Sequence, residues 1–301
     1  MSSPVISVLM PAYNTERYVA EAVESILGQT FTEFEFIIVD DGSTDGSLAV
    51  LRRYAAQDSR IRLVSRPNTG IVGALNEGLS LAQGELIARM DGDDVSLPKR
   101  LELQVAYLDD HPRCVAVGCR VLMVDPDGAP LRITCEELEH DEIVAAELRG
   151  WTAIENASAT YRRCAVMEAG GYRKECETAE DLDLFLRLAE RGDLANLPDV
   201  LYEYRQHFRR ICHCRRGEQA RITREVLKEA RARRGLPVPN DIMAPDVSGV
   251  LSEADQHRTW AWWALRAGHV RTARKHALAA VLKAPLSRLS WRVLACSIRG
   301  Q

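Results

Sequence analysis

Long apolar runs are absent from this chain of 301 residues. A membrane-spanning helix needs about 20 consecutive apolar residues, and no stretch approaches that length. The amino terminus also lacks the basic region, long apolar segment and cleavage site of a secretion signal. We therefore expect a cytoplasmic protein that neither spans a membrane nor is secreted. Its 46% hydrophobic residues suffice for one large core or two smaller ones.

Cys-x-x-Cys pairs are absent too, although the chain has eight cysteines. Without a secretory context these cysteines predict reduced thiols rather than a disulfide framework. Cys212, His213 and Cys214 raise the alternative of a zinc site, but their spacing matches no common structural zinc site.

Acidic residues are absent from positions 257–301, where nine basic residues occur. These are Arg258, Arg266, Arg271, Arg274, Lys275, Lys283, Arg288, Arg292 and Arg299. The rest of the chain is acidic, so the two parts are expected to meet different partners. We expect no nucleic-acid partner, because the body is acidic and contains no nucleic-acid-binding module.

Short β-branched runs alternate with amphipathic stretches over the first hundred residues. Strands are predicted at 5–10, 35–39, 61–65 and 85–90, and helices at 16–27, 47–56 and 72–82. This alternation predicts an α/β fold with a Rossmann-like, mostly parallel sheet flanked by helices. The carboxyl ends of parallel strands meet at one edge of such a sheet, where ligands bind.

Later segments predict a helix at 98–110, a strand at 114–124 and a charged helix at 215–234. Three short helices follow over 253–299, with breaks at Gly268 and Pro285. We therefore place a main domain at 1–210, a helix and linker at 211–245, and a small basic α-helical region at 246–301.

A cluster of carboxylates, Asp91, Asp93 and Asp94, follows the fourth predicted strand. Mg²⁺ and Mn²⁺ prefer oxygen ligands and are commonly bound through one or two carboxylates together with substrate phosphates. The cluster therefore favours a metal site for a diphosphate. The alternative is a solvated turn that caps the next helix. Arg89, which leads directly into this loop, is the strongest of several arginine candidates for a phosphate contact.

A second acidic pair, Asp40 and Asp41, closes the second strand. One of these carboxylates could accept a hydrogen bond from a uracil N–H, while Ser43 or Thr44 caps the following helix. The alternative is that the pair serves capping alone. Tyr13, at the end of the first strand, offers a ring on which a base can stack.

Several stretches occur together in a family's order. They are VLMPAYN at 8–14, QTF at 29–31, IVDDGSTD at 38–45, NTGIVGALNEG at 68–78, ARMDGDD at 88–94, GGYR at 170–173, EDLDL at 180–184, LP at 197–198 and YEYRQH at 202–207. Jointly they resemble family 2 glycosyltransferases of the GT-A fold, of the type that builds bacterial surface polysaccharides. The resemblance covers about residues 4–208.

The resemblance implies an inverting glycosyltransferase that moves a sugar from a nucleoside diphosphate sugar to an acceptor hydroxyl. UDP is the favoured nucleotide, and a glycan or a lipid-linked molecule is the expected acceptor. A metal neutralises charge on the departing diphosphate and one carboxylate takes the acceptor's proton, so no second nucleophilic carboxylate is required.

Particular residues receive roles by the same resemblance. The donor would be bound by Pro11, Ala12, Tyr13, Asp40, Asp41, Asn68, Arg89 and Asp91. Asp93 and His207 would hold Mn²⁺ or Mg²⁺, and Asp181 would be the catalytic base. The alternatives without a catalytic or metal-binding role are that Asp181 only complements a helix dipole and that His207 is an ordinary surface residue.

Two segments depart from the family pattern. Residues 151–163 carry Asn156 where a histidine is frequent, and we expect this segment to line the acceptor pocket. Residues 208–214 replace a run that often contains serine, which alters the expected closing loop over the donor.

Two other functions compete with sugar transfer. A non-catalytic sugar-nucleotide-binding or scaffold protein is the first alternative. A sugar nucleotidylyltransferase is disfavoured, because Pro11-Ala12-Tyr13-Asn14 stands where that class has a glycine-rich loop carrying arginine and lysine.

The basic tail mixes its nine cations with tryptophans and leucines, as a small helical bundle or an interfacial membrane surface does. Three interpretations stay open: a bundle that docks through 257–301 on the anionic inner face of a membrane, a bundle that meets another partner, and a solvated face.

Overall fold

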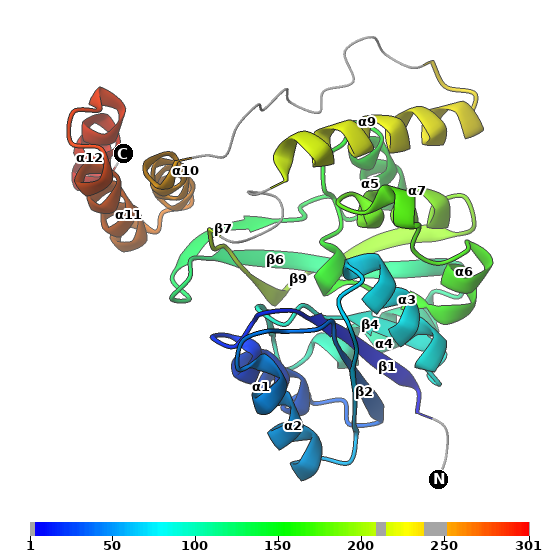
Figure 1. The fold of residues 1–301 in the computed structure, drawn as a ribbon. Helices are drawn as coiled ribbons and strands as arrows, with labels where there is room; N and C mark the ends of the chain where they lie inside the picture. Colours follow the sequence, from blue (N-terminus) through cyan, green and yellow to red (C-terminus); the bar gives the residue numbers. More distant parts are fainter. Residues whose placement is uncertain (1–3, 209–214, 238–251, 301) are drawn as a thin grey trace.

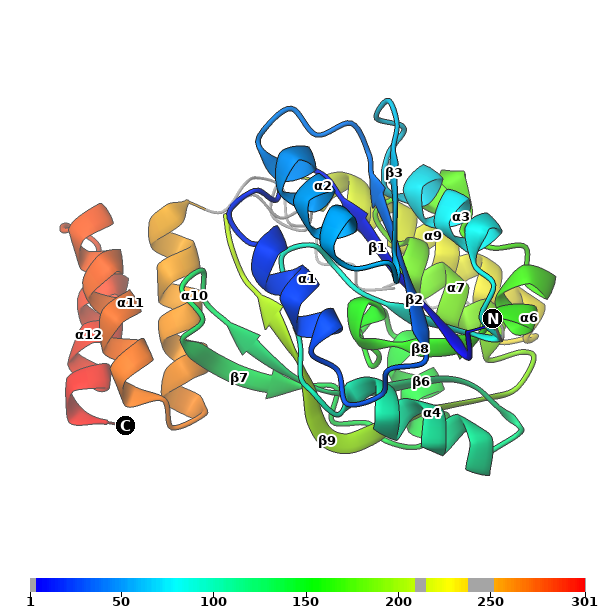
Figure 2. The ribbon, with the colours of Figure 1, turned by 90° about the horizontal axis from the view of Figure 1, so that it is seen from below.

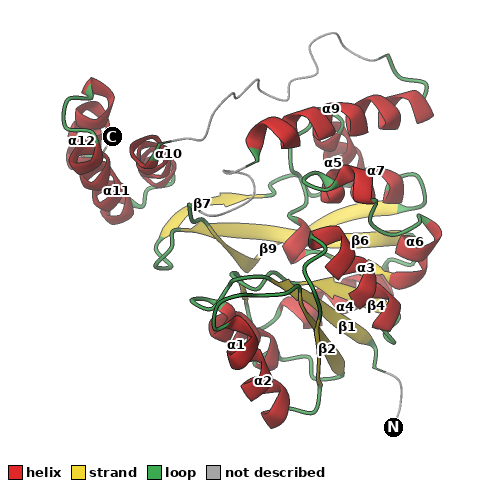
Figure 3. Cartoon of the chain, in the orientation of Figure 1, coloured by secondary structure: helices red, strands yellow, loops and turns green. Residues whose placement is uncertain are grey.

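The computed structural model describes residues 4–208, 215–237 and 252–300. Its main body is a nine-stranded mixed sheet with helices on both faces, and a separate helical bundle stands at one end (Figure 1). Figure 3 shows the same layers, with the strands between two sets of helices. The predicted α/β fold with a C-terminal helical region is confirmed.

Four parallel strands form the amino-terminal half of the sheet, in the order β3-β2-β1-β4. Their bounds are Ile6–Ala12 for β1, Phe34–Asp40 for β2, Ile61–Ser65 for β3 and Leu86–Arg89 for β4. All seven residues of β1 are buried, as expected for a central strand covered on both faces. Each of the four strands overlaps its predicted range.

Three helices connect these strands: α1 (Val19–Leu27), α2 (Ser47–Gln57) and α3 (Ile71–Leu81). Helix α1 buries Val19, Ala22, Val23 and Ile26, which share one helical face because they lie three or four residues apart.

The second half of the sheet continues from β4 in the order β8-β6-β9-β5, with β7 paired to β6. The bounds are Val95–Ser96 for β5, Cys114–Val124 for β6, Pro130–Thr134 for β7, Thr160–Arg162 for β8 and Asp193–Arg205 for β9. Strand β9 runs parallel to β6 and then pairs with β5, so it returns the chain to the carboxyl end of β4.

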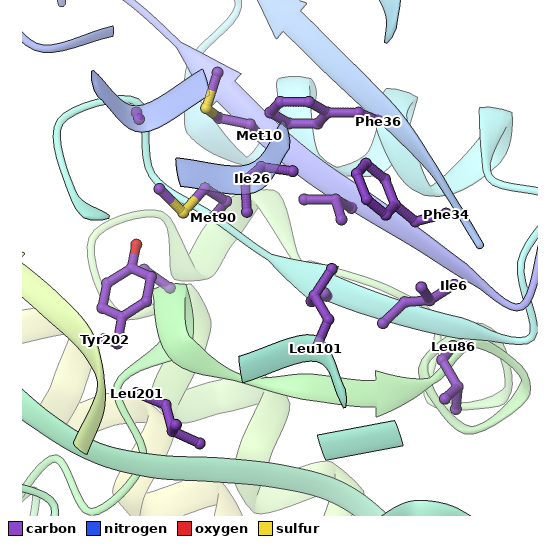
Figure 4. Close-up of a cluster of buried hydrophobic side chains, with 14 of the residues drawn as sticks. Ile6, Met10, Ile26, Phe34, Phe36, Leu86, Met90, Leu101, Leu201 and Tyr202 are labelled. Atoms are coloured by element: carbon purple, nitrogen blue, oxygen red, sulfur yellow. The ribbon is translucent and has the colours of Figure 1, made fainter. Parts of the chain in front are cut away.

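Two hydrophobic clusters fill the space on opposite faces of the sheet. Ile6, Val8 and Met10 point into the cluster beneath α1, α2 and α4 (Arg100–Asp110), whereas Leu9 points into the other. Figure 4 shows Ile6, Met10, Phe36, Leu101 and Tyr202 in the first cluster. Packing on both faces fixes the strands and therefore the loops at their ends.

Further helices cover the second face: α5 (His140–Glu147), α6 (Arg163–Glu168) and α7 (Glu180–Leu188). Helix α9 (Arg216–Arg233) packs on α7 through Ile222, Val226, Leu227 and Ala230. The boundaries set at 210 and 245 stay predictions.

The carboxyl-terminal bundle consists of α10 (Glu253–Arg266), α11 (Val270–Lys283) and α12 (Arg288–Arg299). Figure 2 shows its three helices side by side at the β7 end of the sheet. Gly268, with φ +81°, separates α10 from α11 as expected. Trp260 is completely buried where α10 meets β7.

An ion-pair cluster fastens the bundle to the turn between β6 and β7. The Asp125 carboxylate lies 2.6 Å from Lys275 Nζ and 2.9 Å from His276 Nε2. Burial works to raise the pKa of Asp125, but hydrogen bonds from His276 and Lys275 hold it well below its usual range.

No helix in the described part of the chain combines the length and hydropathy that crossing a bilayer requires. Cysteines within the described ranges are free thiols, as predicted. Cys212, His213 and Cys214 lie outside those ranges.

Candidate functional site

The carboxyl ends of β1, β2, β3 and β4 converge on one edge of the sheet, as the sequence predicts. The Asp41 amide donates to Ala12 O at 2.9 Å, and the Arg66 amide donates to Asp40 O at 3.1 Å. The Met90 amide donates to Leu9 O at 3.0 Å, so the fourth strand end joins the first. Four polar loops therefore meet at this edge.

Asp40 and Asp41 are both buried at the end of β2. Asp40 accepts a hydrogen bond from Ser65 Oγ at 2.9 Å. Asp41 accepts from Arg66 Nε at 3.0 Å and from the backbone amides of Thr69 and Gly70 at 3.0 and 2.9 Å. These carboxylates thus join β2 to the loop that precedes α3 and form one wall of the edge.

Asn68 belongs to the same wall, because its side-chain amide donates to Asp41 O at 2.9 Å. The predicted helix cap at Ser43 or Thr44 is wrong. Helix α2 begins later, at Ser47, and Ser43 and Thr44 instead bond to Asn14. The structure thereby ties the end of β1 to the loop after β2.

Pro11 and Ala12 lie buried in β1, and the chain turns outward at the next residue. The Tyr13 side chain is 49% exposed at the edge of the sheet. Its ring is therefore accessible to a flat ligand.

The acidic loop after β4 gathers Asp91, Asp93 and Asp94, whose oxygens lie within 4.8 Å of one another. A Cβ atom at Gly92 would lie 3.2 Å from Thr15 Oγ1, so the loop packs directly against the end of β1. Carboxylate oxygens are the donors that Mg²⁺ and Mn²⁺ prefer, and the cluster therefore fits such an ion.

The three aspartates have different hydrogen-bond and ion-pair partners. Asp91 pairs with Arg89 at 2.7 Å. Asp94 is buried and accepts from Tyr202 Oη at 3.1 Å and from the Arg205 amide at 2.8 Å, which fixes the loop to β9. Asp94 therefore has a structural task that the sequence did not reveal.

Asp93 contacts His207, the other residue expected at a metal. The distance from Asp93 Oδ2 to His207 Nε2 is 2.8 Å, although 114 positions separate the two residues. The His207 ring stacks on Tyr18, with 5.6 Å between ring centroids. Strand β9 delivers the histidine, because it ends at Arg205 beside the acidic loop.

Arg89 lies beneath the acidic loop and is only 2% exposed. Burial works to lower its pKa, but the Asp91 carboxylate, together with Tyr172 and Tyr161, raises the pKa above the ordinary value. The guanidinium thus holds Asp91 in place in this structure. A contact between Arg89 and phosphate stays a prediction.

Glu180 and Asp181 occupy the first turn of α7, partly buried. Burial raises the pKa of both carboxyls, and the Asp181 charge raises the pKa of Glu180 further. Arg89 lowers the pKa of Asp181 and Asp91 raises it, so Asp181 lies within electrostatic reach of the acidic loop. Raised carboxyl pKa values of this kind are typical of proton-transfer sites.

Asp183, the third acidic residue in the first turn of α7, has a structural role. Asp183 is buried and pairs with Arg187 at 2.6 Å, and it also pairs with Arg173. These pairs stabilise the start of α7 and thereby the position of Asp181.

Asn156, in the segment expected to line an acceptor pocket, is 6% exposed. It accepts a hydrogen bond from Tyr172 Oη at 3.4 Å, and Tyr172 Oη lies 2.6 Å from Tyr161 Oη. Asn156 therefore belongs to a buried polar layer rather than to an open surface. Of the second departure, at 208–214, only Phe208 lies within the described residues.

Glu147 is a buried acid that the sequence reasoning missed. It is 2% exposed and accepts hydrogen bonds from the backbone amides of Ala153 and Ile154 at 2.9 and 3.2 Å. One signal was available: Ile143, Ala146 and Glu147 share a helical face by their spacing, so the acid stands on an apolar stripe.

We expect the substitution Glu147→Gln to raise thermal stability at high pH only. Burial, with the help of the Asp181 charge, raises the pKa of Glu147 from 4.5 to about 8. Between these values the folded chain binds a proton that the unfolded chain has lost, so stability falls as pH rises through this window. The amide stays neutral and escapes this loss.

Melting temperatures of the wild type and the variant should coincide near pH 4.5 and diverge up to about pH 8, with the variant higher. The exposed Glu136, changed to Gln, is the matched control. A difference that stays constant with pH would show that Glu147 is already ionised in the folded chain.

Comparison of the sequence with those of known proteins finds relatives. A family model described as "Glycosyl transferase family 2" matches residues 7–165. The chain is 40% identical over 210 residues to the "Putative glycosyltransferase EpsE" of Bacillus subtilis (strain 168), covering 68% of this chain and 74% of the relative. It is 32% identical over 209 residues to the "Amylovoran biosynthesis glycosyltransferase AmsE" of Erwinia amylovora, covering 67% and 76%.

Solved structures share the fold. One is the mannosyltransferase PcManGT from Pyrobaculum calidifontis in complex with GDP-Man and Mn²⁺, with a TM-score of 0.60 and 24% identity over 99% of this chain and 81% of that one. Another is TarS of S. aureus in complex with UDP-GlcNAc, with a TM-score of 0.61 and 20% identity over 98% and 81%. At these identities the likeness shows the fold alone.

Proposed function

Because the chain belongs to glycosyl transferase family 2, we propose that it moves a sugar from a nucleoside diphosphate sugar to an acceptor hydroxyl in bacterial surface-polysaccharide synthesis. UDP is the favoured nucleotide, and the anomeric centre is inverted. The observation that carries the proposal is the contact of His207 with Asp93 of the acidic cluster, at the edge of the sheet where the Tyr13 ring is exposed.

In this proposal the nucleoside lies at the ends of β1 and β2. The Tyr13 ring stacks on the base, and Pro11 and Ala12 support it from below. Asp40, Asp41 and Asn68 form the wall, where a carboxylate oxygen accepts a hydrogen bond from the uracil ring. The network that already fixes Asp41 to the loop before α3 keeps this wall in place before the donor arrives.

Asp93 and His207 would hold Mn²⁺ or Mg²⁺, and Asp91, positioned by Arg89, would contact the donor sugar or ribose. The ion, when bound, neutralises the negative charge that develops on the departing nucleoside diphosphate. A mannosyltransferase of the same fold was solved in complex with GDP-Man and Mn²⁺, which supports the use of a divalent ion together with a nucleotide-sugar donor.

Asp181 would accept the proton of the acceptor hydroxyl. Its raised pKa makes the ionised form a stronger base, and the Asp181 charge together with burial raises the pKa of the neighbouring Glu180. Attack from the face opposite the leaving group inverts the anomeric centre, so one carboxylate base is sufficient.

A donor panel tests the proposal. UDP-glucose, UDP-N-acetylglucosamine and GDP-mannose are each incubated with the chain and Mn²⁺, and release of the nucleoside diphosphate is measured. We expect release from a UDP-sugar that stops when a chelator removes the metal. Binding of UDP without release from any donor would instead favour a non-catalytic sugar-nucleotide-binding protein.

A further inference from the structure

The last turns of α11, the turn after it and the start of α12 expose large apolar side chains. Leu282 is 74% exposed and Leu286 97% exposed. Leu278, Leu289 and Trp291 are more than half exposed beside them. Scattered single apolar residues are normal on protein surfaces, but several in one turn indicate a contact surface.

Helix α12 buries small polar side chains and exposes large apolar ones, the reverse of an ordinary amphipathic helix. It buries Ser290, Val293 and Ser297 against the bundle, while Trp291 and Ile298, seven residues apart and therefore on one face, are exposed. Alanines at the α10–α11 contact are completely buried, so the bundle packs through small residues. Several large apolar side chains of α11, α12 and the turn between them are left exposed.

The charged residues that neighbour these apolar side chains in the sequence are all basic. Arg288 and Arg292 adjoin Leu289 and Trp291, and Lys283, next to Leu282, pairs with Glu253 of α10. No acidic residue occurs between 257 and 301. Such a surface attracts an anionic partner and repels the same surface of a second copy.

A hollow of about 550 Å³ lies between α10 and α12, lined by Thr259, Trp262, Trp263, Arg266 and Arg292. Arg132 lies over the Trp263 ring, with its guanidinium carbon 4.1 Å from the ring centroid. Guanidinium groups bind phosphate oxygens in pairs, and tryptophan favours places where apolar and aqueous surroundings meet. Both properties fit the headgroup layer of a bilayer.

We propose that the α11–α12 face docks on an anionic lipid bilayer. Leu282, Leu286 and Leu289 enter the boundary of the acyl chains, and the arginines of α12 bind headgroup phosphates. A fluid bilayer accommodates protruding leucines without a preformed groove. Docking of this kind goes beyond the proposed function, because it requires neither the donor nor the metal.

Sedimentation with vesicles tests the proposal on the full chain. We expect binding to phosphatidylcholine vesicles that contain phosphatidylglycerol, no binding to phosphatidylcholine alone, and weaker binding at high salt. Equal binding to both vesicle types, or none to either, would overturn it.

Two sets of variants locate the surface. The triple change Leu282→Asn, Leu286→Asn and Leu289→Asn, and the double change Arg288→Glu and Arg292→Glu, should each lower vesicle affinity at least about tenfold. The control for the first is Met167→Asn, an exposed apolar residue of α6, and for the second Arg52→Glu with Arg53→Glu on α2. Unchanged binding by both sets of variants would overturn the proposal.

Two further measurements separate bilayer docking from catalysis and from self-association. Release of nucleoside diphosphate in solution should not change in the triple and double variants, so a failure of docking and a failure of the proposed function are distinguishable. Light scattering detects the alternative occupant, a second copy whose acidic body meets the basic tail. If the chain self-associates, the same variants abolish that association, and no vesicle binding is seen, the proposal of bilayer docking is contradicted.

Discussion

Replacing Asp93 by alanine is expected to abolish metal-dependent binding of UDP. Asp91 is committed to Arg89, and Asp94 is buried against Tyr202 and the Arg205 amide. Asp93, with His207 as its neighbour, is the carboxylate best placed to bind an ion between the loop and a diphosphate. Without it, the diphosphate would face two carboxylates unshielded, and we expect affinity to fall by more than about 100-fold.

Titration calorimetry with UDP measures this effect in the presence of Mn²⁺ and with a chelator. Asp109→Ala, which removes an exposed aspartate at the end of α4, is the matched control and should bind as the wild type does. Equal UDP affinity of the wild type with Mn²⁺ and with the chelator would rule out the metal site.

Replacing Asp181 by asparagine is expected to lower sugar transfer by roughly 10²–10⁴-fold, the usual contribution of a positioned base. UDP affinity should stay within a few-fold, because in this proposal Asp181 contacts the acceptor rather than the nucleotide. The side chains are nearly equal in size, so the start of α7 should keep its structure. Initial rates at saturating donor measure the loss.

The adjacent acid supplies the comparison. Glu180→Gln should cost less than Asp181→Asn, although it will shift the pH dependence, because each carboxyl raises the cost of ionising the other. The wild-type rate should rise with pH as the base ionises, since burial raises the pKa of Asp181. If Asp181→Asn transfers sugar at the wild-type rate and Glu180→Gln does not, the base is Glu180.

The sequence predicts the amino-terminal half of the sheet because its signals are local. Each strand is a short β-branched run, and each of Tyr13, Asp41 and Asp91 follows such a run directly. The rule that parallel strands share a carboxyl edge then brings these residues together without knowledge of any contact. The three helices of the tail follow from Gly268 and Pro285 in the same local way.

The other half of the site depends on pairings that no local pattern reveals. Strand β9 contains Pro198, so its sequence does not predict a buried strand. In the structure its regular pairing with β6 is interrupted between Leu197 and Val200. Yet this strand brings His207 to Asp93 and the Arg205 amide to Asp94. Only the resemblance to a family placed His207 near the acidic loop.

Burial is the second property that the sequence conceals. Arg89 leads into the acidic loop, and its sequence position does not reveal that its side chain is buried and paired with Asp91. Ser43 and Thr44 precede a helix and resemble caps, yet tertiary contacts with Asn14 take their hydrogen-bonding groups. For Ser43 and Thr44 a distant segment decides the partner, whereas for Arg89 the partner is close in sequence and only the burial is concealed.

The most direct test of the account is a crystal structure of the chain with UDP and Mn²⁺, with diffraction data collected at the manganese absorption edge. The account predicts one anomalous peak between Asp93 and the diphosphate, with the uracil ring against Tyr13. A manganese peak away from Asp93, or UDP bound away from the ends of β1 and β2, would contradict it.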